Sequence, residues 1–254
     1  MIQLPGKSPM RPDELRRHIL DTYLSLRIGI AIIGILFPLV LALGGYLAFG
    51  ICLQGSLSAY YHAAIGDKAM RDWFVGILFA VGVFLYLYKG FSKLENYLLN
   101  AAGVFAVGVA IFPMPWEPCY LQHCNPVDQV PCPAIRGGFL SIHGFFAVSF
   151  FLCIATVALF CAGDTLPLVD DVEMRERLRK TYKGIGIAMI ATMIAAYIFH
   201  INRPSQAFYV ETVGIVFFAA YWWTKSRELK RTTADEEGVK GKLKKDDGDV
   251  VRAS

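Results

Sequence analysis

The chain has 254 residues, of which 55% are hydrophobic, with a mean hydropathy of +0.45 and a formal net charge of +4 at pH 7. This composition is too apolar for an ordinary soluble domain and indicates an integral membrane protein in contact with membrane lipids. The 25 basic residues flank apolar segments and are largely balanced by 21 acidic ones, so the charge gives no reason to expect a nucleic-acid partner.

Residues 1–27 precede the first long apolar run. They carry apolar side chains at helical spacing, at Leu15, Ile19, Leu20, Tyr23 and Leu24. This pattern fits an amphipathic helix on the cytoplasmic membrane surface, and it fits equally a cytoplasmic extension of the first membrane helix.

Six apolar runs are long enough to cross about 30 Å of hydrocarbon as helices, two of them with the help of flanking residues. The runs are Ile28–Phe49, Trp73–Tyr88, Leu98–Phe112, Phe139–Cys161, Ile185–Ile201 and Val210–Trp223. They are continuously apolar rather than alternating, which excludes a β-barrel. We therefore predict an all-α polytopic bundle with six transmembrane helices over residues 28–224.

Basic residues divide unevenly between the two sides of this predicted bundle. With a cytoplasmic N-terminus, 21 of the 25 lie on the cytoplasmic side, and the remainder are Lys68, Arg71, Arg136 and Arg203. Basic loops stay preferentially in the cytoplasm, so both termini are predicted to be cytoplasmic. Residues 225–254 are rich in charge and lack apolar periodicity, which predicts a disordered cytoplasmic tail.

The segment Ile51–Gly66 is too short and too polar for a seventh span, and it predicts an interfacial or re-entrant helix. It contains Ser58 and His62, and Asp72 opens the next apolar run. A serine, a histidine and a carboxylate at the mouth of a helical bundle fit a chemical site. They also fit ordinary interface polarity, with Asp72 placed favourably at a helix N-terminus.

Two further ionisable residues lie in the outer halves of predicted spans, where such groups are costly. They are His143 and Glu211, and we find no acid or histidine deep in the cytoplasmic half of a span. We predict that His143 and Glu211 approach each other, with Ser58, His62 and Asp72 around the same cavity. The pair fits a catalytic or a structural role, and convergence without a metal would favour the structural one.

Four cysteines fall on the predicted outer side: Cys52, Cys119, Cys124 and Cys132. Three of them share the outer loop 113–138, and this oxidising face allows two disulfides in three connectivities. A metal site using His123 with two loop cysteines is the alternative, although C-x4-C matches zinc spacing loosely. Cys153 and Cys161 lie in the fourth run and are expected to be free thiols.

The pattern S-x-x-Y-H at Ser58–His62, followed by Asp72, resembles the hemolysin III, adiponectin-receptor and alkaline ceramidase group, the CREST superfamily. The resemblance implies a zinc-dependent hydrolase of lipid amides, with His62 as a ligand and Ser58 and Asp72 as catalytic residues. That group has seven spans and H-x3-H in its last helix, where this chain has six runs and Glu211. A zinc site would then use His62, His143 and Glu211, an acceptable catalytic donor set.

A wider resemblance is to uncharacterised bacterial integral membrane proteins, and it implies a bacterial inner membrane but no activity. It is carried by RDWFVGILFAVGVFLYLYKG, IHGFFAVSFF and FYVETVGIVFFAAYW. Two functions stay open: a zinc hydrolase facing the outer leaflet, and a non-catalytic lipid-binding or assembly factor. A single haem between His143 and His200 is a weaker alternative, and a dihaem arrangement is excluded because no helix carries two widely spaced histidines.

Overall fold

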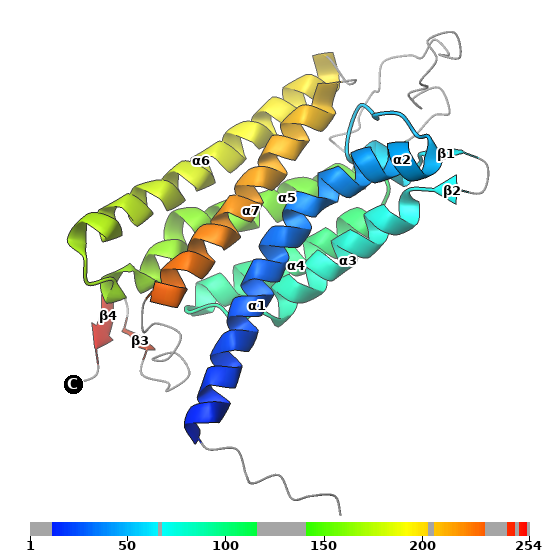
Figure 1. Ribbon diagram of the computed structural model, residues 1–254. Coiled ribbons are helices and arrows are strands. Elements are labelled where there is room, and N and C mark those ends of the chain that lie inside the picture. Colours follow the sequence, from blue (N-terminus) through cyan, green and yellow to red (C-terminus); the bar gives the residue numbers. More distant parts are fainter. Residues whose placement is uncertain are drawn as a thin grey trace, which may run out of the picture.

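The computed structural model describes residues 12–65, 68–115, 141–202, 206–231, 243–246 and 249–252. In this part of the chain, six long helices form one bundle (Figure 1): α1 Pro12–Leu39, α3 Arg71–Leu87, α4 Lys93–Ile111, α5 Ile142–Thr156, α6 Val172–Asn202 and α7 Ala207–Arg231. Shorter helical turns join or extend them: η1 Val40–Gly44, α2 Gly45–Phe49, η2 Ser58–Tyr61, η5 Val157–Cys161 and η6 Ala162–Leu168. Two antiparallel hairpins pair β1 Ala64–Ile65 with β2 Lys68–Ala69, and β3 Leu243–Asp246 with β4 Asp249–Arg252.

Four helical segments are long and apolar enough to cross a membrane: His18–Phe49, Lys93–Ile111, Ile142–Leu168 and Val172–Phe199. The predicted membrane-helix character is therefore confirmed. The other two long helices pack into the same bundle, α3 against α4, and α7 against both α1 and α6 (Figure 1).

The bundle has two ends. The η2 end contains the turn that begins at Ser58, and the Lys225 end contains the last turns of α7. Each has its own core. Tyr60 and Phe74 are buried together near η2, whereas Tyr221 and Trp222 are buried near Lys225.

Helices α3 and α4 are held in close contact by two facing glycines. A Cβ added at Gly82 would lie 2.8 Å from the carbonyl oxygen of Gly103, and one added at Gly103 would lie 2.6 Å from the oxygen of Gly82. Small residues at a crossing let two membrane helices approach along their backbones. This contact fixes the relative position of two helices that line the cavity described below.

Two helices are longer than their apolar runs. Helix α1 is continuous from Pro12, so residues 12–27 extend the first helix, which is one of the two alternatives that the sequence left open, and Arg27 is only 1% exposed. Helix α7 continues to Arg231, so residues 225–231 belong to the bundle rather than to a disordered tail. Lys225 and Glu228 of α7 find buried partners, which the sequence pattern does not show.

The segment after α2 also differs from the expectation. It is not one interfacial helix: after Gly50, which takes a left-handed conformation, the chain runs irregularly into the single turn η2 and then strand β1. Ile51 and Tyr60 bury their side chains against the bundle, which anchors the segment without helical structure.

Candidate active site

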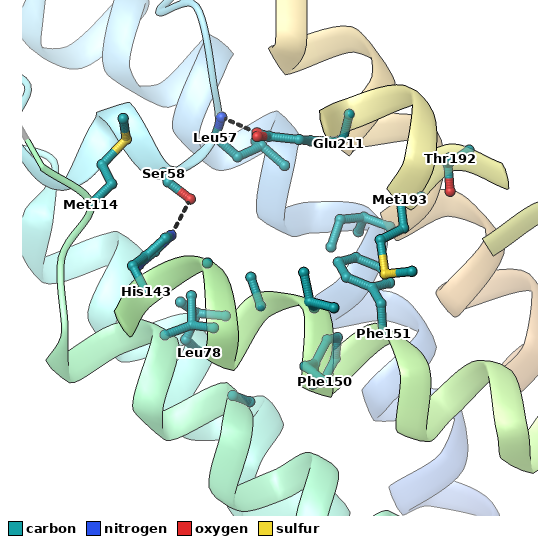
Figure 2. A pocket seen from close by; sticks show the side chains of 18 of the residues that line it. Leu57, Ser58, Leu78, Met114, His143, Phe150, Phe151, Thr192, Met193 and Glu211 are labelled. Atoms are coloured by element: carbon teal, nitrogen blue, oxygen red, sulfur yellow. Dashed lines mark hydrogen bonds between the residues drawn. The ribbon is translucent and has the colours of Figure 1, made fainter. Parts of the chain in front are cut away.

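A cavity of about 140 Å³ lies between the helices near the η2 end, and Figure 2 shows the side chains around it. Its wall includes residues from all six long helices and is apolar apart from Ser58, His143, Thr192 and Glu211. The apolar part includes Phe37, Phe74, Phe150, Phe151 and Met193. A mostly apolar pocket with a few converging polar groups is the usual form of a small-molecule site.

Ser58 and His143 form a hydrogen-bonded pair in the cavity wall. Ser58 Oγ lies 2.8 Å from His143 Nε2, and His143 Nδ1 lies 2.7 Å from the carbonyl oxygen of Phe112. A carbonyl oxygen can only accept, so in the neutral imidazole Nδ1 carries the proton and Nε2 offers a lone pair. The Ser58 hydroxyl therefore donates to Nε2, which is the arrangement that a general base needs beside a serine nucleophile.

Two helix ends place the imidazole of His143. Phe112 is the C-terminal cap of α4, where the last carbonyl groups of a helix lack intrahelical partners. His143 is the second residue of α5, whose N-terminal cap Ser141 accepts a hydrogen bond from the Gly144 amide at 3.1 Å. One helix end thus supplies the carbonyl oxygen that orients a histidine from the first turn of the next helix.

Glu211 of α7 binds the same η2 turn from the other side. Its Oε2 accepts a hydrogen bond from the Leu57 amide at 2.6 Å (Figure 2), and the Phe208 amide donates to the Gly55 oxygen at 2.7 Å. His143 and Glu211 therefore converge on one cavity by holding consecutive residues, Leu57 and Ser58. Both residues thus border one cavity and hold the η2 turn, and their direct approach to each other stays a prediction.

His62 and Asp72 are not part of the cavity wall, so their predicted position around it is wrong. His62 Nε2 lies 3.0 Å from the carbonyl oxygen of Met114, and burial lowers the pKa of His62, partly opposed by this hydrogen bond. Asp72 is 85% exposed in the first turn of α3, with an oxygen 3.7 Å from Arg71 Nε. The carboxylate points away from the bundle, as expected for a charge that favours a helix N-terminus.

The three predicted zinc donors do not form one ligand set in this arrangement. Both nitrogens of His143 are hydrogen-bonded, Glu211 Oε2 holds the Leu57 amide, and His62 lies outside the cavity wall. Among the described residues, no group of three His, Cys, Asp or Glu side chains could hold a metal ion. Zinc stays a prediction.

Three cysteines lie in the described part of the chain. Cys52, six residues before Ser58, is disulfide-bonded. Cys153 and Cys161 are free thiols, as predicted. The loop cysteines Cys119, Cys124 and Cys132 lie outside the described residues, as do most of the predicted loop 113–138 and the side chain of His200, the second histidine of the haem alternative.

A second polar cluster, around Lys225 of α7, was not predicted. The Lys225 ammonium donates to the Ala162 oxygen at 3.1 Å and to Thr165 Oγ1 at 2.6 Å, and it lies 3.3 Å from Glu228 Oε2. Glu228 also accepts hydrogen bonds from the hydroxyls of Thr165 and Tyr182. The side chains of Lys225 and Glu228 are 1% and 0% exposed, so this pair is fully desolvated and joins three elements, η6, α6 and α7.

Glu95, at the start of α4, is buried in the same region. Its Oε2 accepts a hydrogen bond from the Phe91 amide at 2.7 Å, and Lys225 Nζ lies 5.7 Å from the centre of the Phe91 ring. Glu95 and Glu228 lie outside the predicted apolar runs, so the prediction about acids within the spans does not cover them, and their burial was not predicted. Both residues lie where a helix continues beyond its apolar run. Charged residues at such positions usually flank a membrane span and contact water, so the sequence gives no sign that these two are buried.

Comparison of the chain with protein-family models, with curated proteins and with solved structures found no match.

Proposed function

We propose that the protein is a six-span membrane hydrolase that cleaves an acyl bond with the Ser58–His143 pair. The observation that carries this proposal is the position of that pair: a serine hydrogen-bonded at 2.8 Å to a histidine whose other nitrogen faces a carbonyl oxygen, in the wall of an apolar cavity. Serine, base and orienting acceptor are the three parts of an activated nucleophile. Here a backbone oxygen takes the place of the orienting carboxylate.

The proposed reaction has two steps. The Ser58 hydroxyl gives its proton to His143 Nε2 while Oγ attacks the acyl carbonyl, and the leaving oxygen or nitrogen takes that proton as its bond to carbon breaks. A water molecule then gives a proton to His143 Nε2 as its oxygen attacks the carbonyl of the acyl-serine. Nε2 returns that proton to Ser58 Oγ as the bond between Oγ and the acyl carbon breaks, which releases the acid and restores Ser58. Phe112 keeps the proton on Nδ1 through both steps because its oxygen can only accept.

The membrane arrangement is part of the proposal. Packing of α3 and α7 among the four apolar segments supports six spans, and the 21 basic residues on one side support cytoplasmic termini. The η2 end then faces away from the cytoplasm, which agrees with a disulfide at Cys52. The resemblance to bacterial integral membrane proteins supports the bacterial inner membrane, so the acyl compound would arrive from the outer leaflet.

A non-catalytic membrane protein is the second candidate function, and one observation favours it. Ser58, His143 and Glu211 all have hydrogen-bond partners within the protein, as expected of a structural network that fastens the η2 turn to α5 and α7. In this alternative the cavity binds lipid without changing it.

Turnover separates the two functions. We expect the protein in lipid nanodiscs to hydrolyse fluorogenic acyl esters or amides, and Ser58→Ala and His143→Ala to lower the rate about 100-fold or more, the usual contribution of a nucleophile and its base. Two variants serve as matched controls. Ser149→Ala changes a serine of α5 that is not part of the cavity wall, and His18→Ala changes an exposed histidine of α1. Equal rates in wild type and Ser58→Ala would leave the non-catalytic function as the better account.

A further inference from the structure

We infer that the cavity selects acyl compounds whose acyl group has about six carbon atoms, and not the long-chain acyl groups of ordinary phospholipids. This inference rests on the proposed function, because it takes Ser58 as the atom that receives the acyl group. It adds the substrate class, which is set by the size and direction of the cavity.

The size argument compares two volumes. The cavity measures about 140 Å³. An engineered apolar cavity of about 150 Å³ stays dry and binds benzene, a molecule of six carbons. A long-chain acyl group of about 16 carbons has well over twice as many carbons as such a cavity accommodates. The volume therefore matches a short acyl group held between the helices.

The direction argument follows from where the polar groups lie. Figure 2 shows the Ser58–His143 pair on one side of the cavity, with Phe151 and Met193 on another. An acyl carbonyl placed at Ser58 Oγ directs its alkyl chain toward these apolar side chains. The chain then fills the space beside Phe151 and Met193.

Gly214 of α7 forms part of the cavity wall. A Cβ added there would lie 3.2 Å from Thr192 Oγ1 and 3.6 Å from Phe151 Cε1, and both residues line the cavity. Gly214→Ala therefore narrows the cavity from the α7 side. Phe151→Ala has the opposite effect, because it removes an aromatic ring from the wall.

Gly184 on α6 offers a matched control. A Cβ added at Gly184 meets nothing within 4 Å, and this residue is not part of the cavity wall. Gly184→Ala thus makes the same chemical change in the neighbouring helix without altering the cavity.

The test uses alkyl fluorophosphonates from butyl to hexadecyl on the full chain in nanodiscs, with the rate of Ser58 modification measured by mass spectrometry. The expected optimum is near hexyl, and each added methylene beyond the fitting length should lower the rate by roughly tenfold. Gly214→Ala should move the optimum to shorter chains, Phe151→Ala to longer ones, and Gly184→Ala should leave it unchanged. A rate that rises steadily to hexadecyl, or one optimum shared by all variants, overturns the inference.

A second measurement keeps the inference independent of catalysis. Straight-chain alkanamides of the same lengths should raise the melting temperature of Ser58→Ala most near six carbons, again with a shorter optimum when Gly214→Ala is added. If this optimum is found while no probe modifies Ser58, the proposed hydrolase fails and the size selection stands. If stabilisation shows no optimum at any length, the size selection fails, whatever the probes show.

Discussion

The two polar clusters of the bundle differ in what surrounds them. At the Lys225 end, charged side chains are packed without exposed surface, and Lys225 and Glu228 satisfy each other and the hydroxyl of Thr165. At the η2 end, a smaller polar set, Ser58–His143 and Glu211, borders a cavity of about 140 Å³. Polar groups packed against each other hold a fold together, whereas polar groups beside open space are placed to meet a ligand.

The largest expected effect on stability comes from splitting the buried pair at the Lys225 end. Lys225→Ala leaves Glu228 desolvated beside Thr165, and such a broken pair costs about 3–5 kcal/mol. Thermal unfolding in nanodiscs should show a much lower melting temperature than for Lys230→Ala, an exposed lysine on the same helix. Equal melting temperatures for the two variants would mean that the Lys225 cluster does not hold the bundle together.

The next effect concerns the disulfide at Cys52, a residue of the segment that carries Ser58. Disulfides commonly contribute about 2–4 kcal/mol, so Cys52→Ser should lower the melting temperature and loosen the η2 turn. Thiol titration of the denatured, unreduced wild type should find fewer free thiols than the six cysteines of the sequence. Six titratable thiols in protein isolated without reductant would contradict the disulfide.

A smaller effect is expected from Glu211, which holds the Leu57 amide beside Ser58. Glu211→Ala leaves that buried amide without its acceptor, at a cost of about 1–3 kcal/mol, and displaces Ser58 from His143. Glu211→Gln keeps an accepting oxygen and should retain most of the stability and turnover. If both variants lose turnover equally, the carboxylate charge matters, and not only its hydrogen bond to the η2 turn.

The smallest effect is a pH dependence at His62. Burial lowers its folded-state pKa below the unfolded value, which is near 6.5, so its contribution to stability is present above pH 6.5 and is lost as pH falls through the folded-state pKa. His62→Gln should therefore lose less stability than wild type between pH 7 and pH 5. The exposed His18→Gln is the control, and an unchanged slope in His62→Gln would contradict this assignment.

The sequence was sufficient to predict a bundle of membrane helices, because the length and continuity of apolar runs decide whether a helix can cross a bilayer. It also singled out His143 and Glu211 by the cost of ionisable groups at that depth, and Ser58 by its place with His62 and Asp72 at the mouth of the bundle. It did not show that His143 binds Ser58 while Glu211 binds Leu57, since no spacing relates side chains on α5 and α7 to a turn far away in the chain. Glu95 and Glu228 were missed for a related reason: helices extend past their apolar runs, and burial there depends on partners from other elements.

The most direct test of the central claim is peptide mapping after reaction with hexyl fluorophosphonate. The account predicts one modified residue, Ser58, in wild-type protein in nanodiscs, and a rate about 100-fold lower in His143→Ala, because the imidazole takes the serine proton. Modification at another serine, or a Ser58 rate unchanged by His143→Ala, would contradict the assignment of this pair as the active site.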